Sequence, residues 1–489
     1  MGRIYKKGQI LFAATAIPLI SAIVLFWLTS FSANKMPLLL CLTFALIGFW
    51  SIIRILTDFA PYSLNKMHWY FVLVFMVIAP VLHYQSGWVP WGYCLSDTIL
   101  LRANCVLLLW CFSYEMGRIV AGRKGAVGLS TRCHSDLFIP RDSVFRSYLL
   151  LLSLLSFICL VALVGFSSLA VRGEANLNGE GNPLFTVLNI LLRAIPSISS
   201  VIVLLQMKRG CQFRKATDWF ILGSLLIMTV VANNPVSMSR FWTAAVYLGI
   251  VIAALPESWI QGGRFDLIVI IGLFVIFPFM GAFKTMSLEV FLASRNPLSY
   301  LDLASSFKSV DFDAHSLLCR ILIYCDSEGL AWGRQLLSVV CFFVPRSILP
   351  IKGTPTGEMV AISQGQQFTN LSSPLMAEGY VDFGIIGVIA YAFVLGWFMR
   401  LSDDRYWHGT NRSEGPVSFF IPIYLTLFGF VMFIMRGPLQ STFLRLMGFL
   451  LFVLILYFLV DCFAAIKLLR TDGWSQASFP PKNTKQRDF

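Results

Sequence analysis

The chain consists mostly of long, continuously apolar runs separated by short polar segments. A helix needs about 20 apolar residues to cross the hydrocarbon core of a bilayer, and the sequence contains about twelve such runs. They lie near residues 10–30, 37–57, 69–86, 97–117, 147–169, 184–206, 217–233, 240–256, 265–283, 379–400, 417–435 and 445–466. A membrane β-strand would be shorter and would alternate apolar with polar residues. The pattern therefore predicts an all-α polytopic membrane protein.

The predicted spans are distributed unevenly along the chain. Nine lie in residues 1–283, a long segment follows at 284–378, three more spans lie in 379–466, and 467–489 form a polar tail. The first apolar run, which ends at Leu28, is longer than the ~7–15 residues of a cleavable signal peptide. We expect it to be an uncleaved first transmembrane helix.

Composition agrees with a membrane protein. Of the 489 residues, 57% are hydrophobic and 13% are charged, whereas about 25% of the residues of a soluble domain are charged. A water-soluble protein of this size would need more polar surface. The eleven cysteines show neither CxxC nor Cys/His ligand spacing, so we predict neither a disulfide framework nor a zinc site.

The net charge of +13 indicates which side of the membrane each segment occupies. With the N-terminus in the cytoplasm, 24 basic residues fall in cytoplasmic segments and seven in external segments or outer helix ends. The other seven lie in 284–378, which is too long to follow the positive-inside rule. We therefore predict cytoplasmic termini and an external segment 284–378, and no nucleic-acid partner.

The external segment carries patterns of its own. Apolar residues within His315–Tyr324 fall on one helical face, and Gln335–Val344 is an apolar run too short to span, which predicts a re-entrant or interfacial helix. Gly353–Gly357 and Ser363–Ser373 have the composition of loops. A structured external segment beside a helical bundle indicates work on a molecule at the outer membrane face.

Placing an arginine in or near the outer part of a membrane span costs free energy, so such an arginine needs an anionic partner. Planar guanidinium groups that converge from several helices would suit phosphate oxygens. Alternatively, each arginine anchors a lipid headgroup or pairs with a structural carboxylate. The candidates for an anion-binding set are Arg193, Arg240, Arg346 and Arg436, and the roles of Arg172, Arg295, Arg320 and Arg445 remain open.

Several outer-face residues could serve as a general acid or base. We favour Glu378, because it stands where a loop meets the tenth span and partial burial there would raise its pKa. It could equally cap that helix or pair with an arginine. His315 is the second candidate, and the further ones are Asp302, Glu358 and Asp382.

The sequence contains one possible acidic metal pair at the outer face. Asp311 and Asp313 flank Phe312, but their neighbours supply no further obvious ligands. We therefore predict no metal and no cofactor.

Three segments together resemble a known family. They are Asn234–Trp242 (NPVSMSRFW), Phe343–Gly353 (FVPRSILPIKG), and Ala377–Gly387 (AEGYVDFGIIG) followed by Met435–Gly437 (MRG). The chain is similar there, and in its layout, to the Wzy-type O-antigen polymerases of the bacterial inner membrane. Ile348 and Leu349 stand where that family typically has an aromatic residue after Arg-Ser.

The resemblance implies a GT-C-like membrane glycosyltransferase that acts without a metal. A polyprenyl-diphosphate-linked glycan would be transferred to a hydroxyl of a second lipid-linked repeat unit at the periplasmic face. Arg193, Arg240, Arg346 and Arg436 would neutralise the diphosphate, and Glu378 or His315 would deprotonate the acceptor. Partners would be the lipid-linked donor and acceptor, the bilayer and a chain-length regulator.

Two alternatives share the membrane layout. An O-antigen ligase would transfer finished glycan onto lipid A core. A flippase for lipid-linked oligosaccharides would move its substrate without chemistry. It would be expected to line a central cavity with charges from both halves and to lack a large external segment, which this chain has. We find no similarity between the halves of this chain.

Overall fold

The computed structural model describes residues 36–92, 95–128, 138–170, 183–209, 216–260, 263–277, 280, 307–344, 347–410 and 416–475. Within these ranges the chain is helical, with no strand and a single isolated bridge between Phe138 and Ser418. The all-α prediction is confirmed for this part of the chain.

Eleven of the twelve predicted spans coincide with helices over their described residues. The run at 10–30, and residues 278–279 and 281–283 of the run at 265–283, lie outside the described residues. The helices are α2 (Leu38–Thr57), the continuous α3, η2 and α4 (Leu64–Phe71, Val72–Ile78, Ala79–Ser86), α5 (Asp97–Gly128), α6 (Ser143–Val164), α9 (Pro183–Lys208), α10 (Ala216–Ala232), α11 (Arg240–Ala254), α13 with η3 (Arg264–Ile271, Gly272–Ile276), α20 (Leu375–Asp404), α21 (Phe420–Arg436) and α22 (Leu439–Ser475). Short helices connect them: α7 (Phe166–Ala170), α12 (Glu257–Ile260) and η7 (Arg405–Thr410).

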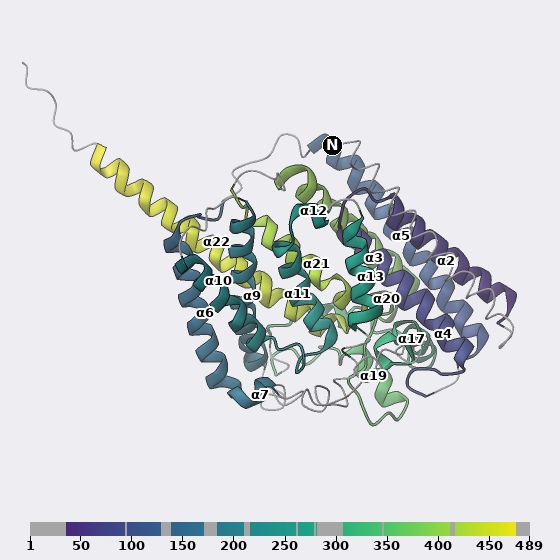
Figure 1. Cartoon of the computed structure of the whole chain (residues 1–489). Helices are drawn as coiled ribbons and strands as arrows, with labels where there is room; N and C mark the ends of the chain where they lie inside the picture. The colour runs from purple at the N-terminus through teal and green to yellow at the C-terminus, as the bar shows by residue number, and fades with distance from the viewer. Residues whose placement is uncertain are drawn as a thin grey trace, which may run out of the picture.

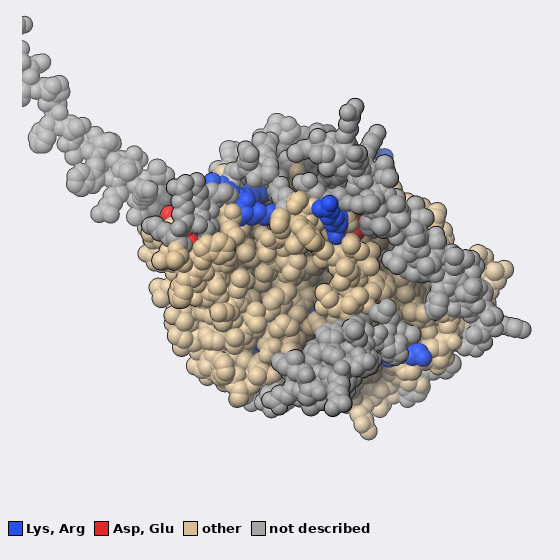
Figure 2. Space-filling view, viewed as in Figure 1, with Lys and Arg blue, Asp and Glu red and all other residues tan. Residues whose placement is uncertain are grey.

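Seven helices in the described ranges are long and apolar enough to cross a membrane, and α10, α11 and α21 are shorter apolar helices. Several of the long helices turn large apolar side chains outward. Leu151 and Leu155 of α6 are 62% and 61% exposed, and Leu42 of α2 is 55% exposed. Figure 2 shows a broad surface without charged side chains, with Lys and Arg gathered mainly along its upper edge. Lipid is the solvent that such a surface requires.

The helices form two groups joined by a central pair. Helices α6, α9, α10 and α22 pack together on one side, and α2, α3, η2, α5 and α20 on the other. Between them lie α11 and α21, which pack against each other (Figure 1).

Glycines allow the central pair to approach closely. A Cβ at Gly429 of α21 would overlap the carbonyl oxygen of Ala245 of α11, and one at Gly249 would lie 3.2 Å from the carbonyl oxygen of Leu425. Membrane helices commonly use small residues in this way. The register is antiparallel and places Phe241 against Phe433, with ring centroids 6.2 Å apart. The beginning of α11 therefore lies beside the end of α21.

The part of the external segment that the structure describes forms η6 (Val310–Phe312), α17 (Ala314–Glu328), α18 (Arg334–Val340) and α19 (Thr356–Ser363). The helix predicted at 315–324 is present as α17. The run at 335–344 is helical up to Val340. The loop predicted at Gly353–Gly357 is wrong at its end, because Pro355 caps α19, which begins at Thr356. We call this end of the bundle the α17 face (Figure 1).

Helix α20 folds back near its start. Phe383 and Gly384 have non-helical dihedral angles, and the φ of Gly384 is +61°, which glycine adopts without steric cost. A Cβ at Gly387 would overlap the carbonyl oxygen of Gly379. Residues 375–382 therefore form a separate short helix against the start of the long one. The predicted span at 379–400 runs across this break.

Candidate functional site: an arginine–aspartate cluster

Two of the predicted arginines converge on one short segment, η6 with the residue after it. Arg240, at the start of α11, forms an ion pair with Asp311, and its Nη1 donates to the carbonyl oxygen of Phe277 at 2.8 Å. Arg436, at the end of α21, donates from Nη2 to Asp313 Oδ1 at 2.8 Å and to the Val310 carbonyl oxygen at 2.9 Å. The antiparallel packing of α11 and α21 brings the two together.

Asp313 is a buried connection point of this cluster. Its side chain is fully buried, and besides Arg436 it accepts hydrogen bonds from Ser372 Oγ at 2.8 Å and Trp91 Nε1 at 2.9 Å. The acidic pair Asp311 and Asp313 therefore binds one guanidinium group each. Within the described residues, no three His, Cys, Asp or Glu side chains gather into a possible metal site.

Aromatic rings support the guanidinium groups. Arg240 lies 4.8 Å from the ring centroid of Phe277, and Arg436 lies 4.7 Å from that of Phe241. A guanidinium group over an aromatic face gains about 0.5–2 kcal/mol. The rings thus fix positively charged groups at the ends of apolar helices.

Arg445 is a third cation on the same aromatic cluster, and sequence reasoning left its role open. Its guanidinium lies 5.3 Å from the ring of Phe433, which stacks on Phe241, and 6.0 Å from that of Trp242. No carboxylate within the described residues lies within 4 Å of it. Arg445 lies on α22, six residues after the helix begins at Leu439 and inside a candidate membrane span, and a cation in that position is the sequence signal that could have assigned it.

Arg193 does not join this cluster through any hydrogen bond that the structure describes. It is 3% exposed on α9, its Nε donates to Asn189 Oδ1 at 2.8 Å, and its Nη1 donates to the carbonyl oxygen of Ala232. Met238 Sδ lies 3.9 Å from the same nitrogen. Arg193 thus holds the α10–α11 loop that precedes Arg240. Its Nη2 has no hydrogen-bond partner among the described residues.

The other predicted residues lie away from the arginine–aspartate cluster or outside the described residues. Arg320 is buried and donates to Gln364 Oε1 at 2.7 Å and to the Pro90 carbonyl oxygen at 2.9 Å, which is a structural role. Glu358 lies half-buried on α19. The residues outside the described ranges are Arg172, Arg295, Asp302 and Arg346.

Glu378 lies near the cluster, on the short helix before the fold-back. It is 2% exposed and accepts hydrogen bonds from Thr356 Oγ1 at 2.6 Å and from the Leu439 amide at 3.2 Å. Leu439 begins α22, three residues after Arg436. A carboxylate at a helix N-terminus is favourable, so Glu378 caps α22 rather than its own helix.

Asp382, one turn further on, caps a different helix. Its carboxylate accepts hydrogen bonds from the amides of Gln335 and Leu336, at the start of α18, at 3.0 and 2.9 Å, and from Tyr391 Oη at 2.8 Å. The two acidic residues of the resembling segment thus fasten α18 and α22 to the fold-back of α20.

His315 is 1% exposed at the start of α17. The amide nitrogen of Asn104 donates to Thr43 Oγ1, which leaves the amide oxygen facing His315. That oxygen accepts a hydrogen bond from His315 Nε2 at 2.9 Å. The other ring nitrogen, Nδ1, lies 3.9 Å from Cys319 Sγ. Burial, with a smaller contribution from nearby His83, lowers the pKa of His315 to about 3. The imidazole is therefore neutral at physiological pH.

Two pockets open near these residues. One, of about 630 Å³, lies between α4, the 87–97 loop and α17, and its lining includes His83, Asp97 and His315. The other, of about 440 Å³, lies between α17, α18 and residues 350–354, and its lining includes Arg334 and Val381. The α17 face therefore has a pocket on each side of α17, the first lined mainly by apolar groups and the second mainly by polar groups.

Comparisons with protein families, with curated proteins and with solved structures find no match to this chain.

Proposed function

We propose that this chain is a glycosyltransferase of the bacterial inner membrane that polymerises polyprenyl-diphosphate-linked oligosaccharide repeat units into O-antigen or a related surface polysaccharide. One observation carries the proposal. Residues from two of the resembling segments and from the Met435–Gly437 stretch, distant in sequence, lie at the α17 face: Arg240 and Arg436 bind η6 and the residue after it, and Glu378 binds the start of α22. Such convergence of cations and a buried carboxylate suits chemistry on an anionic, lipid-linked substrate.

The reaction needs a site for a leaving diphosphate. The acceptor hydroxyl oxygen attacks the anomeric carbon of the donor sugar, and the bond from that carbon to the diphosphate oxygen breaks. Polyprenyl diphosphate leaves with the electron pair of that bond, and the hydroxyl proton passes to a base. Negative charge thus grows on the diphosphate, where preorganised guanidinium groups stabilise it most.

The cluster has the charge for this task. Arg240, Arg436 and Arg445 carry three positive charges, against two negative charges on Asp311 and Asp313. The carboxylates and rings hold the arginines in place, and Arg445 provides the charge that the carboxylates leave uncompensated. Nε of Arg436 is buried and has no hydrogen-bond partner among the described residues, so the described part of the protein leaves this donor unfilled.

Glu378 is the base that we propose for the acceptor hydroxyl. Its carboxylate is oriented by Thr356 and by the start of α22, close in sequence to Arg436. His315, neutral and hydrogen-bonded to Asn104, is better suited to shaping the adjacent pocket. In this proposal the α17 face is periplasmic, both termini are cytoplasmic, and a chain-length regulator is a further partner.

Purified protein incubated with synthetic lipid-linked repeat units tests the proposal. A ladder of products with increasing numbers of repeats indicates a polymerase. A single transfer onto lipid A core indicates the ligase reaction. Movement of the lipid-linked substrate across vesicles without any new glycosidic bond indicates a flippase and contradicts the proposal.

A further inference from the structure

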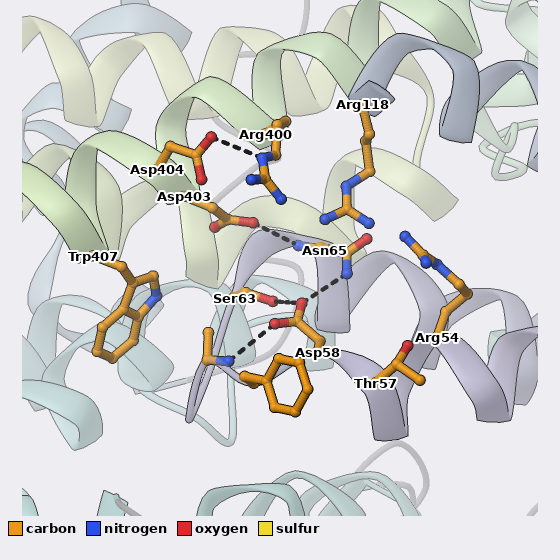
Figure 3. A pocket seen from close by; sticks show the side chains of 12 residues that line it. Arg54, Thr57, Asp58, Ser63, Asn65, Arg118, Arg400, Asp403, Asp404 and Trp407 are labelled. Carbon is orange, nitrogen blue, oxygen red and sulfur yellow. Dashed lines mark hydrogen bonds and ion pairs between the residues drawn. The ribbon is translucent and has the colours of Figure 1, made fainter. Parts of the chain in front are cut away.

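A second polar site lies at the end of the bundle opposite the α17 face. It is a pocket of about 510 Å³ between the end of α2, the start of α3, α5 and the ends of α20 and η7 (Figure 3). Three arginines from three helices line it: Arg54, Arg118 and Arg400. We call it the three-arginine pocket. The proposed function makes no use of it.

The carboxylates around the pocket already have hydrogen-bond donors. Asp58 accepts from Ala60 N at 3.1 Å, and from Ser63 Oγ and Asn65 Nδ2 at 2.7 Å each. Asp403 accepts from the amides of Leu64 and Asn65 at 3.0 and 3.3 Å, and from Tyr424 Oη at 2.7 Å. Both carboxylates are thus engaged in holding the first turn of α3.

Two of the arginines are paired. Arg54 binds Glu115 with two hydrogen bonds, from Nε at 2.8 Å and from Nη2 at 2.6 Å. Arg400 donates from Nε to Asp404 at 2.7 Å. Because the two-bond geometry uses both oxygens of Glu115, little of that carboxylate remains for a second cation.

Arg118 is the arginine left over. Its side chain is 10% exposed, and its Nη1 forms an ion pair with Glu115 Oε1 at 3.6 Å, which is too long for a hydrogen bond. Its Nε and Nη1 are buried with no hydrogen-bond partner in the described part of the chain. Figure 3 shows the guanidinium directed into the pocket, between Asn65 and Arg400. A guanidinium buried to this degree normally has its donors filled.

We propose that the three-arginine pocket binds a phosphate ester group, with Arg118 as its main ligand. The carboxylates around the pocket already accept hydrogen bonds, whereas N–H groups of Arg118 have no acceptor. A ligand that completes the pocket should therefore supply a hydrogen-bond acceptor. Counting Glu115, the pocket has four carboxylates and three guanidinium groups. Because the negative groups outnumber the positive ones by one, a multiply charged nucleotide polyphosphate would be repelled more strongly than a singly charged phosphodiester. Phe59, 69% exposed at the rim, gives the pocket an apolar edge that suits a phospholipid.

Native mass spectrometry of the full-length protein tests this site, with phosphatidylglycerol as the probe and diacylglycerol as the lipid without phosphate. We expect the wild type to retain phosphatidylglycerol in preference to diacylglycerol. Arg118→Gln should retain about tenfold less, because a charge-assisted hydrogen bond is lost. Arg123→Gln is the matched control, since Arg123 is exposed on the same helix and does not line the pocket.

Two further arms complete the test. Arg400→Gln, which removes a 38% exposed side chain with less risk to folding, should also lower retention. Millimolar inorganic phosphate that displaces the lipid assigns the site to free phosphate, and failure to displace it assigns the site to the lipid headgroup. If Arg118→Gln and Arg400→Gln both fold and retain phosphatidylglycerol as the wild type does, the proposal is wrong.

Discussion

Arg436 and Asp313, 123 residues apart in sequence, form a largely buried ion pair in which Nη2 lies 2.8 Å from Oδ1. The pair joins the end of a membrane helix to the external segment. Its side chains are 15% and 0% exposed, so solvent screens it weakly. Arg240 and Asp311 repeat the arrangement two residues earlier on η6.

Asp313→Asn should destabilise the protein strongly. The change leaves Arg436 buried without its counter-charge, which costs about 3–5 kcal/mol when one partner of a buried pair is removed. Thermal unfolding in detergent measures the effect. Asp326→Asn is the control, because the Arg102–Asp326 pair is exposed and exposed pairs contribute about 0–1 kcal/mol. Equal effects of the two substitutions would contradict the role given to Asp313.

Gly429→Ala should disturb the cluster from a distance. A Cβ there overlaps the Ala245 carbonyl oxygen, so α11 and α21 must separate, at a cost of about 1–3 kcal/mol. Transfer activity should fall with stability, because Arg240 and Arg436 move apart. Gly223→Ala, with open space around the new Cβ, should be neutral or slightly stabilising. If both variants unfold at the wild-type temperature, the close packing of α11 and α21 is wrong.

Arg445→Gln should lower glycan transfer about 10²–10³-fold, the usual effect of removing one preorganised donor from a developing negative charge. Polymer yield in cells, normalised to the amount of protein in the membrane, measures it. Arg405 is the matched control, since its guanidinium lies over the Phe420 ring at 4.3 Å away from the cluster. Loss of activity in Arg405→Gln as large as in Arg445→Gln would remove the special role of Arg445. If Arg346→Ala and Arg436→Ala both leave polymer length and yield in cells unchanged, the assignment of these arginines to the diphosphate is wrong.

Glu378→Gln distinguishes a base from a helix cap. The amide keeps the size of the side chain but cannot take a proton, so transfer should fall by about 10²–10⁴-fold while stability falls by about 1 kcal/mol. Thr356→Val removes one hydrogen bond to the same carboxylate and should affect stability more than transfer. Full activity of Glu378→Gln would leave Glu378 as the cap of α22 alone.

His315 should make the protein less stable in acid. The unfolded chain takes up a proton below its ordinary pKa of about 6.5, whereas the folded protein stays neutral down to about pH 3. Stability is therefore lost as the pH falls between these values, by about 2 kcal/mol at pH 5. The difference between the unfolding midpoints at pH 5 and pH 7.5 should be smaller in His315→Gln than in the wild type. An unchanged pH dependence in that variant would mean that His315 is not buried in neutral form.

The membrane helices could be predicted because each is a continuous apolar run, which is the strongest signal that a sequence carries. The fold-back at Phe383–Gly384 could not be predicted, since a single glycine interrupts a run that stays apolar. Helix α19 was missed for the opposite reason: its eight residues include Thr356, Gly357 and Glu358, which are also common in loops.

The sequence indicated which arginines belong to the candidate site, but not which carboxylate each arginine binds. The arginines stand out because they lie where the positive-inside rule does not place them. Which carboxylate each one binds depends on the packing of α11 against α21, and no local pattern contains that information. Arg445 remained undecided because its environment, two aromatic rings from α11 and α21, is assembled from distant segments.

Glycosyl transfer by this protein is tested by the amount of polyprenyl diphosphate that the purified protein releases from synthetic lipid-linked repeat units. We expect one polyprenyl diphosphate to be released for each new glycosidic bond, and both quantities to fall strongly in Arg445→Gln but not in Arg405→Gln. Glycosidic bonds formed without release of polyprenyl diphosphate, or no transfer by the folded wild-type protein with any lipid-linked glycan, would contradict it.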